Sequence, residues 1–146
     1  MALVEVNRSI TRHIKDVWEI VSDISCYPNF MPSVNEVTIL EDKRPKWTVS
    51  RWSATLRDSV MEWTEIDHYD ASRARIDFRQ LEGDLESLDG SWQLYNEAGQ
   101  TRVCLLMNFR IGIPSIEDIL TPIAIQALEE NCHGMLEDIE KQLRVS

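Results

Sequence analysis

The first candidate functional residue in this sequence is an amide on a strand face that should be dry. In the segment Arg73–Gln80 the even positions carry Ala, Ile, Phe and Gln, so Gln80 shares a predicted strand face with Ile76 and Phe78. An amide on an apolar face costs about 1–3 kcal/mol unless a partner, a water or a ligand satisfies it. Gln80 is therefore a candidate polar contact for a ligand, and a hydrogen-bonded core amide is the alternative.

Asp67 is a candidate general base in the preceding predicted strand. It shares parity with Met61, Trp63 and Glu65, so its side chain could enter the same apolar space. A carboxylate in such a place would have a raised pKa, which suits a group that removes a proton from a substrate. The alternative is a carboxylate at the strand end that faces water beside His68.

Arg51 is the third candidate catalytic residue. It has the parity of Val49 in its strand and could reach a ligand carbonyl, although arginines near strand ends usually face solvent. The three cysteines, Cys26, Cys104 and Cys132, are far apart, and the histidines are not clustered, so no zinc site is predicted. No Ser-His-Asp set or phosphate loop offers a competing site, and we expect neither a metal nor a cofactor.

Length and composition predict one globular domain over residues 1–146. Hydrophobic residues make up 43% of the chain and charged residues 27%. The net charge of −10 disfavours nucleic acid as a partner, because a polyanion would be repelled. No apolar run approaches the roughly 20 residues of a membrane span, and the first ten residues do not resemble a signal peptide. We therefore expect a cytoplasmic protein without stable membrane insertion.

Hydrophobic spacing predicts an α+β chain. A short strand at Leu3–Asn7 precedes a helix that starts after an N-cap at Thr11 and ends near Asp23, and a second short helical turn ends at Pro32. Alternating segments separated by turn-rich pieces then predict an antiparallel meander of six strands. These strands are Val34–Leu40, Lys46–Leu56, Ser59–His68, Arg73–Leu81, Leu85–Tyr95 and Thr101–Ile111.

The last predicted element is a long helix from about Pro122 to Leu143, with Thr121 as its N-cap and proline at the first helical position. At 1.5 Å per residue it would extend about 33 Å, which is enough to cross the whole sheet. Gly134 inside it lowers helix stability by about 1 kcal/mol relative to alanine. This glycine indicates either close packing or space left beneath the helix.

Five short motifs occur in order along nearly the whole chain: Val17–Ile24, Tyr27–Phe30, Glu62–Trp63, Phe78–Gly83 and Gly90–Trp92. Together with the order of the elements, they resemble the START (SRPBCC) superfamily in its polyketide cyclase/dehydrase and lipid-transport branch. This branch includes aromatase/cyclases and coenzyme Q-binding proteins. The resemblance implies the helix-grip fold, in which a curved antiparallel sheet wraps around a long C-terminal helix and two short helices follow the first strand.

The resemblance also implies a deep, mostly apolar cavity for a hydrophobic small molecule. The alternative is that the same bulky residues simply fill a core. The residues expected to line the cavity are Tyr27, Phe30, Met31, Trp52, Trp63, Phe78, Gln80, Trp92, Met107, Phe109 and Asn131.

The activity implied by the resemblance is the cyclisation and dehydration of a polyketide-type chain without a cofactor, with Asp67, Gln80 and Arg51 as candidate catalytic residues. The family's cavity arginine, four residues after Trp63, is replaced here by Asp67, and its cavity tyrosine falls on Val34. An acyl carrier protein could deliver such a ligand to a monomer or homodimer. A non-enzymatic carrier of an isoprenoid or lipid, such as a quinone, is the alternative, and an interaction module on an acidic surface is the weakest hypothesis.

Overall fold

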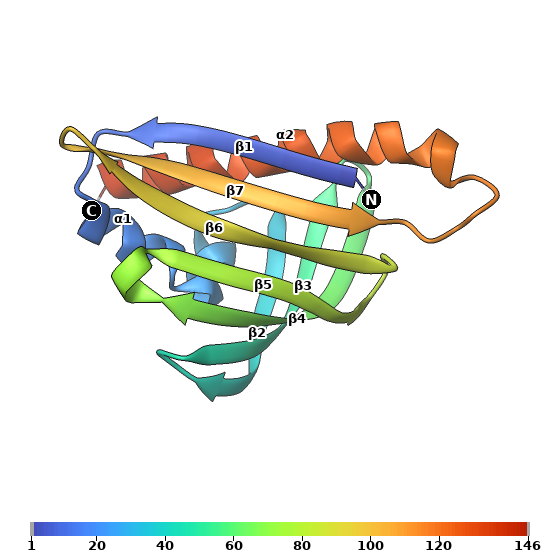
Figure 1. Ribbon diagram of the computed structural model, residues 1–146, viewed down its shortest axis with the longest axis horizontal. Helices are drawn as coiled ribbons and strands as arrows, with labels where there is room; N and C mark the ends of the chain where they lie inside the picture. Colours follow the sequence, from blue (N-terminus) through green and yellow to red (C-terminus); the bar gives the residue numbers. More distant parts are fainter. Residues whose placement is uncertain (1, 146) are drawn as a thin grey trace.

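The computed structural model describes residues 2–145, which form a seven-stranded antiparallel sheet and a long C-terminal helix (Figure 1). β1 (Ala2–Ile10) is followed by helix α1 (Ile14–Val21) and the 3₁₀ helix η1 (Ile24–Asn29). The remaining strands are β2 (Val34–Lys43), β3 (Trp47–Leu56), β4 (Ser59–Asp70), β5 (Arg75–Gly83), β6 (Ser87–Glu97) and β7 (Gln100–Arg110). A single 3₁₀ turn, η2 (Ala71–Arg73), joins β4 to β5, and α2 (Glu117–Arg144) ends the chain.

The strand order is β1-β7-β6-β5-β4-β3-β2, so β2 to β7 form a meander and β1 pairs with the last strand. Helix α2 packs mainly against β1, while α1 contacts α2 and β6, and η1 contacts β2. These helices lie on the concave side of the curved sheet (Figure 1). The prediction of an α+β helix-grip fold is confirmed.

The hairpin of β5 and β6 has the faces that its alternation predicts. Ile76 and Phe78 on β5 and Trp92 and Leu94 on β6 are all buried in the core. Gly90 lies opposite Phe78 in the register. A Cβ atom at position 90 would collide with the backbone carbonyl of β7 that lies beside it, so only glycine allows this close approach of β6 to β7.

Both predicted N-caps were wrong. Helix α1 begins at Ile14 after an N-cap at His13, and α2 begins at Glu117, five residues before Pro122. The earlier start of α2 is supported by two backbone hydrogen bonds, from Glu117 N–H to the Ile113 carbonyl and from Leu120 N–H to the Ile116 carbonyl. Pro122 is tolerated near the N-terminus because it removes only one helical hydrogen bond there.

Candidate active site

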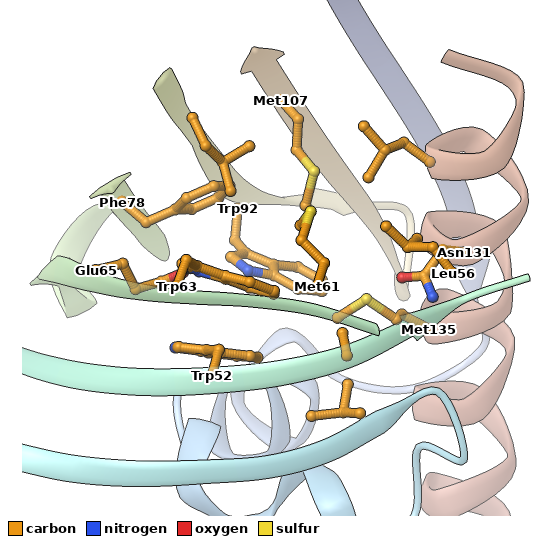
Figure 2. Close-up of a pocket in the computed structure, with 14 residues that line it drawn as sticks. Trp52, Leu56, Met61, Trp63, Glu65, Phe78, Trp92, Met107, Asn131 and Met135 are labelled. Carbon is orange, nitrogen blue, oxygen red and sulfur yellow. The ribbon is translucent and has the colours of Figure 1, made fainter. Parts of the chain in front are cut away.

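A pocket lies between the concave face of the sheet and the middle of α2 (Figure 2). About 40 Å³ of it can be reached by the centre of a water molecule, so a larger ligand requires its walls to move. The lining residues come from the strands β3 to β7, from helix α2 and from the first residue of β2. They are Val34, Trp52, Ala54, Leu56, Met61, Trp63, Glu65, Phe78, Leu88, Trp92, Met107, Leu128, Asn131 and Met135.

The walls combine rigid and adaptable side chains. Trp52 and Trp63 are stacked, with ring centroids 5.5 Å apart and an interplanar angle of 12°. Met61, Met107 and Met135 extend into the pocket from β4, β7 and α2 (Figure 2). Unbranched methionine side chains can change rotamer at low cost, so they are the walls that can yield to a ligand.

Glu65 is the ionisable residue of the pocket lining, and it adjoins a second buried carboxyl, Asp67. Their side chains are on the same face of β4, and the residues are only 5% and 2% exposed. Glu65 Oε1 accepts a hydrogen bond of 2.6 Å from the Trp63 indole Nε1, and the two carboxyls are hydrogen bonded to each other. Asp67 Oδ2 accepts hydrogen bonds from Ser50 Oγ at 3.2 Å and Thr48 Oγ1 at 3.5 Å.

Burial raises the pKa of Glu65 well above its ordinary value, and the nearby charge of Asp67 raises it further. Burial also raises the pKa of Asp67, but hydrogen bonds donated by Glu65, Ser50 and Thr48 oppose this increase. Two touching carboxyls in a dry site cannot both ionise easily. Both shifts favour retention of a proton by the pair, and the hydrogen bond from Glu65 to Asp67 places that proton on Glu65.

Polar side chains of β3 and β4 extend this network away from the pocket. Trp52 Nε1 donates to Ser50 Oγ at 2.8 Å, and Thr48 Oγ1 lies 2.8 Å from the Tyr69 hydroxyl. Burial raises the pKa of Tyr69, so its phenol stays neutral. These contacts fix the orientation of Asp67, which in turn positions Glu65 at the pocket wall.

Of the residues predicted to line the cavity, the structure brings six together in the pocket wall: Trp52, Trp63, Phe78, Trp92, Met107 and Asn131. Tyr27, Met31 and Phe109 are fully buried core residues outside this lining, and Phe30 packs against the core. Tyr27 stacks edge-on against both Trp52 and Trp92, and its hydroxyl donates to the Val21 carbonyl. Tyr27 therefore supports the pocket from behind.

Gln80 is on the inner face of β5, directly opposite Glu65 in the register, but it is outside the pocket lining. Its Nε2 donates to the Leu85 carbonyl at 2.9 Å across the end of the hairpin. Its Oε1 is buried without a hydrogen-bond partner among the residues that the structure describes. Because the side chain folds toward the hairpin end, the amide helps to shape the turn.

The prediction that Arg51 could reach a ligand was wrong, because the face of β3 that it shares with Val49 is the outer one. The register pairs Trp52 with Trp63 and Met61 with Ala54, so the even positions of β3 face the pocket. Arg51 pairs with Thr64 and its side chain is exposed on the outer face. It cannot contact a ligand inside the pocket.

Glu65 was not selected as a candidate from the sequence, although a signal was present. It lies between Trp63 and Asp67 at spacings of two residues, so the parity that pointed to Asp67 applied equally to Glu65. Two carboxylates on one apolar strand face are costly to bury, which makes the pair more informative than either residue alone. The exposed His68 follows on the opposite face.

Two further findings concern the described chain as a whole. Within residues 2–145, no three His, Cys, Asp or Glu side chains are grouped as metal ligands would be. The helices of this part of the chain also lack the combination of length and apolarity that a membrane span needs.

Comparison with known proteins places these features in a family. Similar solved structures include a protein from Thermus thermophilus, with a TM-score of 0.91, 23% identity and coverage of 99% of this chain and 98% of that one. The Zhui aromatase/cyclase from Streptomyces sp. R1128 has a TM-score of 0.87 and 22% identity, with 97% and 92% covered. A START superfamily protein from Mycobacterium smegmatis has a TM-score of 0.82 and 16% identity, with 97% of both chains covered.

These identities show a shared fold, and no match was found among curated proteins. Residues 10–136 match the sequence model of the family described as Polyketide cyclase / dehydrase and lipid transport. This match extends from the end of β1 into the second half of α2 and includes the whole meander. The chain therefore belongs to the polyketide cyclase/dehydrase and lipid transport family.

Proposed function

We propose that this protein binds a hydrophobic, polyketide-type small molecule in its pocket and promotes cyclisation and dehydration of that molecule. The observation that carries the proposal is the buried Glu65 carboxyl, which lines an otherwise mostly apolar pocket and is hydrogen bonded to the buried Asp67. Family membership and the fold shared with aromatase/cyclases support the class of reaction.

Ring closure of a poly-β-ketone needs a base and an acid in one place. The base removes a proton from a methylene between two carbonyls, and the resulting carbanion forms a carbon–carbon bond with another carbonyl carbon. The alkoxide that forms takes up a proton. Loss of a second methylene proton and of the hydroxyl as water completes the dehydration.

The Glu65–Asp67 pair can perform both transfers because it holds one proton and one negative charge. It accepts the methylene proton and returns a proton to the alkoxide, so each cycle leaves the pair unchanged. Glu65 is the member that lines the pocket, and Asp67 holds it in position through their mutual hydrogen bond. The apolar walls exclude water, which strengthens these electrostatic interactions.

The stacked rings of Trp52 and Trp63 would set the conformation of the bound chain. A flexible chain can fold in many ways, and holding the reacting carbons close together removes much of the entropic barrier. The indole of Trp63 also binds Glu65 directly, so the wall and the acid–base group are fixed relative to each other.

A carrier of an isoprenoid or lipid is the second candidate function. The small number of polar groups in the pocket and the lipid-transport members of the family favour it. A carrier, however, needs no acid–base group, and burying two carboxyls destabilises the fold. The Glu65–Asp67 pair therefore favours an enzyme.

The test is to isolate the protein from its own host and to identify the extracted ligand by mass spectrometry. We expect a cyclised or dehydrated aromatic product to co-purify, because the product keeps the apolar surface that binds the pocket. Recovery of an isoprenoid or lipid that incubation with fresh protein leaves chemically unaltered would instead favour the carrier.

A further inference from the structure

The polar end of the pocket is acidic, and the described residues that line the pocket include no cation. Glu65 alone among the described lining residues has an ionisable side chain. The charged and titratable groups around the pair and its neighbours are the neutral phenols of Tyr27 and Tyr69, the exposed His68, the acidic Asp23 beside Tyr27, and Arg44 near Tyr69, which is already paired with Asp42. A ligand that reaches Glu65 therefore meets a buried carboxyl pair and no cation in the pocket lining.

The hydrogen bonds already made by the pair decide which ligand group it can accept. The Trp63 indole, the Ser50 hydroxyl and the Thr48 hydroxyl all donate to the pair, and the shared proton lies between its two carboxyls. Each carboxyl oxygen has two lone pairs, so Glu65 keeps acceptor sites, and before the pair has accepted a proton from a substrate its own proton is engaged with Asp67. A ligand group that donates a hydrogen bond fits this end, whereas a group that only accepts does not.

A ligand carboxylate would be excluded by charge. It would place a second negative charge beside the pair in a medium of low dielectric constant, where like charges repel strongly. The ligand would have to bind an additional proton before it could enter, which weakens binding at neutral pH. A hydrocarbon meets no repulsion but also gains no hydrogen bond.

We propose that the inner end of the pocket selects neutral ligands that carry a phenol or enol hydroxyl and excludes carboxylates. This inference rests on the proposed function, because it describes the ligand of the same pocket. It predicts that the enol form of a β-diketone binds with its hydroxyl toward Glu65, and that free fatty acids are poor ligands. The pocket thereby distinguishes a polyketide chain from an ordinary lipid acid of similar apolar area.

Three compounds with the same bicyclic frame test the proposal: 2-naphthol, 2-methylnaphthalene and 2-naphthoate. Their dissociation constants are measured by equilibrium dialysis at pH 7 with the wild-type chain. A hydrogen bond accepted by Glu65, strengthened by the Asp67 carboxylate behind it, predicts that 2-naphthol binds about tenfold more tightly than 2-methylnaphthalene. We expect 2-naphthoate to bind at least about tenfold more weakly than 2-methylnaphthalene.

The variant Glu65→Gln/Asp67→Asn keeps the shape of the pair and removes its charge. In this variant, the ratio of the dissociation constant of 2-naphthoate to that of 2-methylnaphthalene should fall at least about tenfold. Glu62→Gln is the matched control, because Glu62 lies on the same strand with an exposed side chain on the outer face. This control should retain the wild-type order, and circular dichroism checks that both variants are folded.

Equal binding of 2-naphthol and 2-naphthoate by the wild type would overturn the proposal and leave the pocket itself in place. Unchanged discrimination in the folded double variant would overturn it as well. If none of the three compounds binds, the pocket is not a site for hydrophobic ligands, and the proposed function fails together with this inference. The order of the three dissociation constants in the wild type tests the proposal even if the double variant does not fold.

Discussion

Replacing Glu65 with glutamine is expected to lower the rate of ring closure and dehydration at least about 100-fold, which is the lower range for loss of a general acid–base group. Glutamine has nearly the shape of glutamate, and its amide can accept the Trp63 N–H and donate to Asp67. It cannot take up or release a proton, so catalysis is lost while the pocket wall remains. Affinity for the substrate should change by less than about tenfold, or ~1.4 kcal/mol.

The measurement is the initial rate of water loss from a synthetic poly-β-ketone, followed by mass spectrometry, together with the dissociation constant of the same compound. Asp67→Asn should also slow the reaction, because it removes the partner that shares the proton. Glu62→Gln makes the same chemical change on the exposed face of β4 and should leave the rate unchanged. A Glu65→Gln variant with wild-type turnover would remove Glu65 from the mechanism.

The second large effect is on stability as a function of pH. Glu65 and Asp67 both have raised pKa values in the folded protein, so the pair keeps a proton that the unfolded chain releases above about pH 4. The unfolded state then binds fewer protons than the native state, and the free energy of unfolding falls as pH rises. The stability associated with this proton is fully present below the unfolded pKa values and is lost as pH rises toward the folded pKa.

One proton gives a slope of about −1.4 kcal/mol per pH unit within this window. Other carboxyls act in the opposite direction, because the pKa values of Asp42, Asp70, Glu117 and Glu130 are lowered. The informative quantity is therefore the difference between wild type and Glu65→Gln/Asp67→Asn, in which these common contributions cancel. Urea denaturation from pH 5 to pH 8 should show the variant gaining stability relative to wild type, and parallel curves would contradict the shared proton.

Most of the fold follows from local patterns in the sequence. Period-two alternation located the six strands of the meander, because β3 to β7 each bury one face and the edge strand β2 keeps the alternation while burying only Val34. The ends of the helices were less accurate. Pro122 is a strong signal for a helix start, but the backbone hydrogen bonds of the turn at Ile113–Ile116 let α2 begin earlier.

The site was harder to predict because parity gives two faces without saying which one is buried. Trp63 and Asp67 were assigned to the inner face together, and the structure places both there. Arg51 was assigned to the wrong face because the register between β3 and β4 could not be read from either strand alone. Gln80 has the inner parity, but the fold of its side chain toward Leu85 depends on the shape of the hairpin.

The mechanism, the ligand class and the pH dependence all depend on the proton shared by Glu65 at the pocket wall and Asp67 behind it. The most direct measurement is an infrared difference spectrum at pH 7 between wild type and the Glu65→Gln/Asp67→Asn variant. We expect the wild type to show the carbonyl band of one protonated carboxyl, which the variant lacks. A difference spectrum with only ionised carboxylate bands would show that the pair holds no proton at neutral pH and would rule out the shared-proton mechanism.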